Sequence, residues 1–74
     1  MSKKKELKRA IKESEKEIET LEKKRTRSSS ALMEAHVNGV APKAADVEYF
    51  KVYSNLIELE RQNLRQLKAE LEKL

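Results

Sequence analysis

Apolar residues recur along this chain at alternating spacings of three and four, the period of a helix that packs one face in a coiled coil. In the first half the repeat occupies Leu7, Ile11, Ser14, Ile18, Leu21, Arg25, Ser28, Leu32 and Ala35. In the second half it occupies Val47, Phe50, Ser54, Ile57, Arg61, Leu64, Lys68 and Leu71. We call these two sets the seam. They predict two long helices, over about residues 4–38 and about residues 42–74.

The strongest break in this pattern is the segment 38–42, with the sequence Asn-Gly-Val-Ala-Pro. Gly39 can adopt the left-handed conformation that ends a helix, and Pro42 suits the first turn of a new one. A turn this short brings two helices back side by side. The sequence therefore predicts an all-α fold, a two-helix antiparallel coiled-coil hairpin in which residues 1–74 form a single unit.

When the chain folds back at this turn, seam positions of the two helices face each other in pairs. The two residue numbers of each pair add up to the same value, as an antiparallel register requires. Small residues meet at Ser28 and Ser54, where the backbones can approach. The pairs in the middle of the seam are Arg25 with Ile57, Leu21 with Arg61, and Ser14 with Lys68. We interpret the long basic side chains as lying along the groove with their charges turned to water. The alternative is that polar seam residues penalise slipped registers.

The two chain ends carry weak helix signals. Lys3, Lys4 and Lys5 place positive charge at a helix N-terminus, where the macrodipole disfavours it, so fraying is expected there. Leu74 is followed by no capping residue, a pattern typical of a truncated or engineered piece of a longer protein.

The second helix has more apolar positions than one seam can cover. A second stripe, Tyr49, Val52, Leu56 and Leu59, follows spacings of three, four and three and is predicted on the far face, while Tyr53, Leu67 and Leu74 flank the seam. A hairpin with one seam buries little apolar area for the residues it orders. We therefore predict that the stripe, with Tyr53 as a secondary contact, binds a protein, either a second copy through this helix or a different chain. The alternative is that these side chains simply face solvent.

Composition removes most other functions. The chain has 41% charged residues, one glycine, one proline and no cysteine, which excludes a disulfide framework and a thiolate zinc site and argues against a sheet. It shows no apolar run long enough to span a bilayer and no secretory signal, so a cytoplasmic location is expected. His36 is the only histidine, and no nucleophile or base can be placed beside it. We expect no enzyme activity, no cofactor and no metal.

Two basic clusters, at residues 3–12 and 23–27, contribute to a net charge of +4 and could contact phosphates. Acidic residues between them and the lack of interleaved aromatic residues argue against nucleic acid as the partner. A small RNA-binding hairpin is one alternative function, and a designed or structural coiled coil without a specific ligand is another.

Residues 39–53, followed by Leu56, Ile57, Leu64 and Leu67, resemble the central turn of the flagellar export protein FliJ and its type III secretion relatives. The resemblance covers about residues 20–70 and includes the aromatic pattern of Tyr49, Phe50 and Tyr53. It implies a long antiparallel coiled coil that acts as a stalk, with the export ATPase and the membrane export gate as partners. The chain is shorter than such proteins usually are, and it lacks the terminal extensions expected to enter the ATPase ring.

Overall fold

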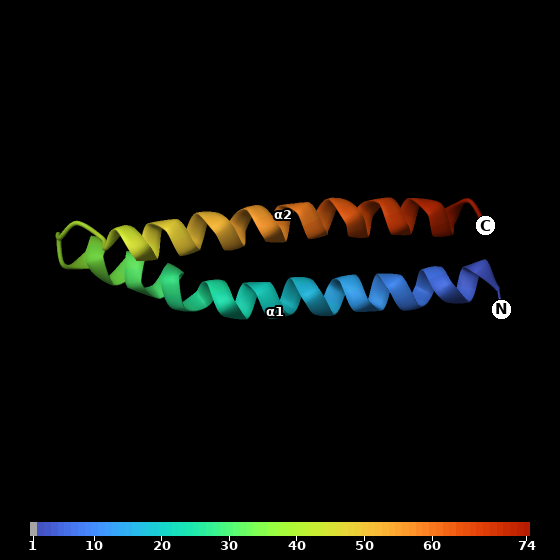
Figure 1. Ribbon diagram of the computed structural model, residues 1–74, viewed down its shortest axis with the longest axis horizontal. Helices are drawn as coiled ribbons and strands as arrows, with labels where there is room; N and C mark the ends of the chain where they lie inside the picture. The colour runs from blue at the N-terminus through green and yellow to red at the C-terminus, as the bar shows by residue number, and fades with distance from the viewer. Residues whose placement is uncertain (1) are drawn as a thin grey trace.

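The computed structural model describes residues 2–74 and contains two α-helices in that range. Helix α1 spans Lys3–Val37 and helix α2 spans Ala44–Glu72. The helices lie side by side and run in opposite directions, so both chain ends lie at the same end of the molecule (Figure 1). The molecule measures 55 × 17 × 15 Å. The predicted all-α hairpin is confirmed.

Gly39 ends α1 in the left-handed conformation that the sequence predicts, with φ of 66°. Its N–H donates to the carbonyl of His36 at 3.1 Å, and the N–H of Val40 donates to the carbonyl of Ala35 at 3.0 Å. These two bonds form a Schellman motif, which satisfies carbonyl groups that the last helical turn leaves without partners. The motif turns the chain toward α2.

Helix α2 begins two residues later than predicted. Lys43 is its N-cap residue, with an extended backbone at φ −67° and ψ 139°, and its carbonyl accepts from the N–H groups of Asp46 and Val47. Pro42 therefore precedes the cap and shapes the turn, instead of occupying the first helical turn. Asp46 lies in that first turn, where its charge complements the macrodipole.

The start of α1 is capped, although its lysines predict fraying. The Ser2 side chain accepts a hydrogen bond from the Lys5 N–H at 3.2 Å, and the Ser2 carbonyl accepts from the Glu6 N–H at 3.2 Å. Serine is a favoured N-cap residue, and Glu6 places a negative charge in the first turn. Both features oppose the unfavourable effect of the three lysines.

The core lies along the predicted seam. Leu7, Ile18, Leu21 and Ile57 are buried, and so are Ser14 and Ser28. Ile57 is the most enclosed, with 1% of its surface exposed, and it forms a cluster with Ile18 and Leu21. Tyr53 and Leu64 pack against this cluster. Every other seam position is at least partly buried except Arg61 and Lys68, whose exposure agrees with charges turned to water.

Arg25 does not follow that interpretation, because its guanidinium contacts residues of α2 instead of turning to water. Its Nη1 donates to the Ser54 Oγ at 3.2 Å, and its guanidinium carbon lies 5.6 Å from the centre of the Phe50 ring. A second polar link joins Arg61 Nη2 to Glu22 Oε2 at 3.2 Å. Each link joins α1 to α2, and the residue to which each arginine donates lies within one helical turn of the residue predicted to face it.

Ser14 is buried with 3% exposure, and its hydroxyl has no hydrogen-bond partner. Replacing Ser14 with alanine removes this unpaired group and adds helix propensity, so the free energy of unfolding should rise by about 1 kcal/mol. Urea denaturation measures the change. Ser29→Ala, at an exposed position, isolates the propensity contribution. An increase for Ser14→Ala no larger than that for Ser29→Ala would show that burying the hydroxyl carries no cost.

Candidate protein-binding site

The second stripe is open to solvent. Tyr49 is 59% exposed, Val52 and Leu56 are each 42% exposed, and Leu59 is 62% exposed. All four lie on α2, which is regular from Ala44 to Glu72, so their spacing places them along one side of a continuous helix.

The stripe begins beside the groove between the helices and not on the opposite face. The rings of Tyr49 and Tyr53 stack with their centres 6.5 Å apart and their planes at 21°. Tyr53 in turn packs against the core cluster. The predicted far-face position is therefore wrong for Tyr49, because its stacking on Tyr53 connects the stripe to the core. Tyr53 flanks the seam as predicted.

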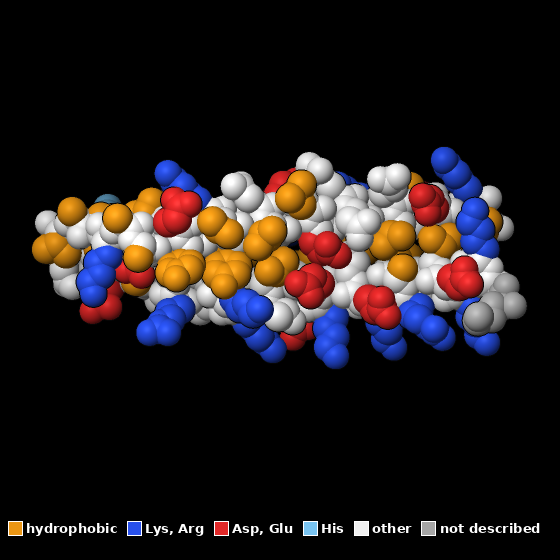
Figure 2. Space-filling view, viewed as in Figure 1, with side chains coloured by type: hydrophobic (Ala, Val, Ile, Leu, Met, Phe, Trp, Pro, Cys, Tyr) orange, Lys and Arg blue, Asp and Glu red, His pale blue; other side chains and the backbone are white. Residues whose placement is uncertain are grey.

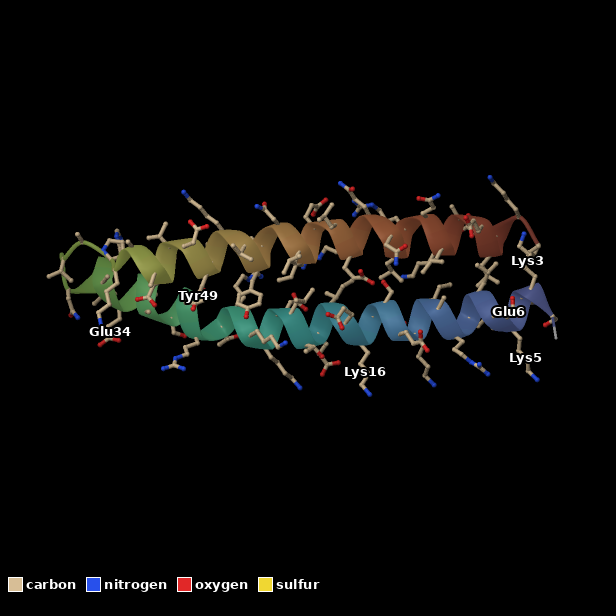
Figure 3. All side chains as sticks on the ribbon, in the orientation of Figure 1. Lys3, Lys5, Glu6, Lys16, Glu34 and Tyr49 are labelled. Carbon is tan, nitrogen blue, oxygen red and sulfur yellow. The ribbon has the colours of Figure 1, made fainter. Side chains whose placement is uncertain are left out.

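A shallow groove of about 560 Å³ lies next to this pair. Its lining comes from both helices: Lys24, Arg27 and Ser28 of α1, and Asp46, Tyr49 and Tyr53 of α2. Figure 3 shows Tyr49 reaching from α2 toward α1. In Figure 2, apolar side chains gather along the line between the helices, and basic side chains project along the outer edge of α1.

The charges around the groove are unevenly distributed. The ion pairs of the described residues join Lys23 to Glu19, Arg61 to Glu22, and Arg65 to Glu58. Lys24 and Arg27 take part in none of them. The groove therefore has an aromatic wall on α2 and a wall on α1 whose cations have no internal carboxylate partner.

A second group of exposed apolar residues lies at the turn end of the hairpin. Met33 is 64% exposed, Val37 is 75% exposed and Val40 is 59% exposed. Sequence analysis did not single out these residues, although the spacing of four between Met33 and Val37 is a detectable signal. They are separate from the stripe and lie on α1 and the turn.

The cation wall of the groove was also missed by sequence analysis. Lys24 and Arg27 belong to the basic cluster at residues 23–27, but the sequence does not show that two members of this cluster face the aromatic pair. Within residues 2–74, no group of three or more His, Cys, Asp or Glu side chains is arranged to hold a metal ion. No helix in that range is both long enough and apolar enough to cross a membrane.

Taken together, the surface offers aromatic and aliphatic packing beside unpaired positive charge, a combination suited to contact with another protein. Comparisons of the chain with protein-family models, with curated proteins and with solved structures give no match.

Proposed function

We propose that the protein is a non-enzymatic interaction module, a stiff helical hairpin that binds a partner protein through Tyr49, Val52, Leu56 and Leu59, with Tyr53 as a secondary contact. One observation carries this proposal: these apolar side chains are exposed, regularly spaced and connected to the core through the Tyr49–Tyr53 stack. Isolated apolar residues are common on protein surfaces, but a contiguous row is typical of an interface.

Burial of this row supplies the driving force for association. Covering an aliphatic side chain contributes roughly 1.5–3 kcal/mol relative to leaving it exposed, and the four stripe residues retain a large part of their surface for that purpose. Because the stripe lies on a regular helix anchored by Ile57, little backbone ordering is needed when a partner binds. A preformed surface of this kind favours binding.

The resemblance of residues 39–53 to the FliJ family supports a more specific role. In that role the hairpin is a cytoplasmic stalk component of the flagellar or type III protein export apparatus, and its partners are the export ATPase and the export gate. The 55 Å length of the hairpin supports this role physically, because a rod can hold two partners at a fixed separation. A homo-oligomer formed through α2 is the competing use of the same stripe.

Leu56→Glu should weaken binding to the partner by at least about tenfold while the chain keeps nearly all its helicity, since a carboxylate placed in an interface loses its hydration. Isothermal titration against the purified export ATPase and the cytoplasmic part of the export gate measures the effect. Gln62→Glu adds the same charge at an exposed position outside the stripe and is the matched control.

The possible results separate the two levels of the proposal. If the wild-type chain binds neither export component, the role in export is wrong. If sedimentation shows a dimer that Leu56→Glu disrupts, the stripe is an interface and a second copy is its partner. If Gln62→Glu weakens binding as much as Leu56→Glu, the stripe is not the contact surface.

A further inference from the structure

The two walls of the groove differ in chemistry. Between Tyr49 and Leu59, α2 carries a single basic residue, Lys51, which lies two positions from both Tyr49 and Tyr53. Residues two apart on a helix point to different sides, so Lys51 is directed away from the groove. Positive charge beside the stripe therefore comes from α1.

Lys24 and Arg27 are three residues apart on α1 and both line the groove. Neither forms an ion pair with a carboxylate among the described residues. The one acidic side chain in the lining, Asp46, lies in the first turn of α2, where the positive end of the helix dipole offsets its charge. The groove next to Tyr49 and Tyr53 is consequently a site of net positive potential.

We propose that the occupant of this site is an amphipathic helix of another protein with acidic residues along one edge. Its apolar face covers Tyr49, Leu56 and the adjoining ring of Tyr53, and its carboxylates meet Lys24 and Arg27. Tyr49 and Leu56 are seven residues apart, or about 10 Å of helix, so a partner segment of about three turns is long enough to cover them. This inference rests on the proposed function and specifies the chemistry of the partner.

The positive section of the groove is limited in length. Seven residues before Lys24 the same face of α1 carries Glu17, and seven residues after Tyr53 the same face of α2 carries Glu60. The acidic edge of the partner therefore matches only the section nearer the turn. Extending that edge toward the open end of the hairpin would place carboxylates beside Glu17 and Glu60, which disfavours longer acidic segments and fixes the position of the partner.

A second copy of this chain fits the surface less well. A twofold contact uses the same patch on both copies, so a second copy brings its own unpaired Lys24 and Arg27 to the edge of that contact. Like charges in that position oppose association. An acidic helix from a different protein avoids this repulsion.

Three synthetic helical peptides of about four turns test the proposal. Each carries leucines at spacings of three and four, and the adjacent edge carries glutamate, glutamine or lysine. Fluorescence anisotropy at low salt measures their affinities for the full chain. The glutamate peptide should bind at least about tenfold more tightly than the lysine peptide, with the glutamine peptide between them.

Charge reversal on the protein should reverse this order. The double variant Lys24→Glu/Arg27→Glu is expected to bind the lysine peptide most tightly, and Lys24→Gln/Arg27→Gln should bind all three peptides about equally. All four exchanged positions in the test and control variants are exposed, so helicity should be retained. The matched control, Lys8→Glu/Lys12→Glu, changes net charge equally but lies outside the groove, and it should leave the order of affinities unchanged.

Each contrary result identifies what has failed. If the wild-type chain binds all three peptides with equal affinity, and Leu56→Glu abolishes that binding, the acidic edge of the partner is wrong and the stripe remains an interface. A loss of preference in Lys8→Glu/Lys12→Glu as large as that in Lys24→Glu/Arg27→Glu would show that only net charge matters. Absence of binding by all three peptides would overturn the proposed partner class, while titration with the export components separately tests the proposed function. A wild-type dimer that Leu56→Glu disrupts would assign the groove to a second copy.

Discussion

Replacement of Ile57 by glutamate is expected to unfold the hairpin. Ile57 is 1% exposed and lies at the centre of the cluster with Ile18 and Leu21. Truncating a buried isoleucine to alanine already costs roughly 2–5 kcal/mol, and a buried carboxylate without a partner adds a desolvation penalty. A two-helix unit of this size has little stability to lose. Far-ultraviolet circular dichroism should show loss of most helical signal at room temperature.

The adjacent residue is the matched control for this variant. Leu56→Glu introduces the same charge one position away, at a side chain that is 42% exposed. Its helical signal and urea midpoint should remain close to those of the wild-type chain. Equal loss of helicity in the two variants would contradict the assignment of Ile57 to the core and Leu56 to the surface.

Substitution of Gly39 by valine is the second change with a large expected effect. Gly39 has a φ of 66°, and a side chain in this left-handed region costs roughly 1–2 kcal/mol, with β-branched residues at the upper end. A Cβ atom built at Gly39 meets no atom within 4 Å, so the penalty comes from the backbone and not from crowding. The free energy of unfolding should fall by about 2 kcal/mol in urea denaturation.

Gly39→Asn serves as the control for the backbone effect, because asparagine tolerates the left-handed conformation better than valine does. Its loss of stability should be clearly smaller. A strained turn also favours opening of the hairpin and exchange of helices between chains, so Gly39→Val should show more dimer in sedimentation as concentration rises. If valine and asparagine cost the same, the left-handed turn is not the source of the penalty.

The sequence was sufficient to predict the architecture. One glycine and one proline in 74 residues leave a single place for the chain to reverse, and the alternating spacing of three and four identifies the face of each helix that packs. Ile18, Leu21 and Ile57 are buried as that pattern predicts. The exposed stripe on α2 was also detectable, because its spacing is helical and its residues fall outside the seam.

Features that depend on side-chain reach or on neighbouring backbone groups were not predictable in the same way. Arg25 occupies a seam position, yet its flexible side chain extends to Ser54 and the Phe50 ring, which spacing alone does not specify. The Ser2 cap is a local backbone interaction that the adjacent lysines obscured. Which cations of α1 face the groove depends on how the two helices are rotated about their axes. The positions of Lys24 and Arg27 beside the tyrosines therefore became visible only in the three-dimensional structure.

The distance between the two ends of the chain tests the hairpin most directly. The described residues contain no cysteine, so Lys8→Cys and Lys73→Cys provide two labelling positions, both exposed and near the open end. Double electron–electron resonance on the doubly spin-labelled chain should give a distance set by the 17 Å width of the hairpin and the length of the labels. The distance should persist when labelled chains are diluted with unlabelled ones. A separation of about 100 Å, as in one continuous helix, or a short distance that disappears on dilution would contradict the intramolecular hairpin.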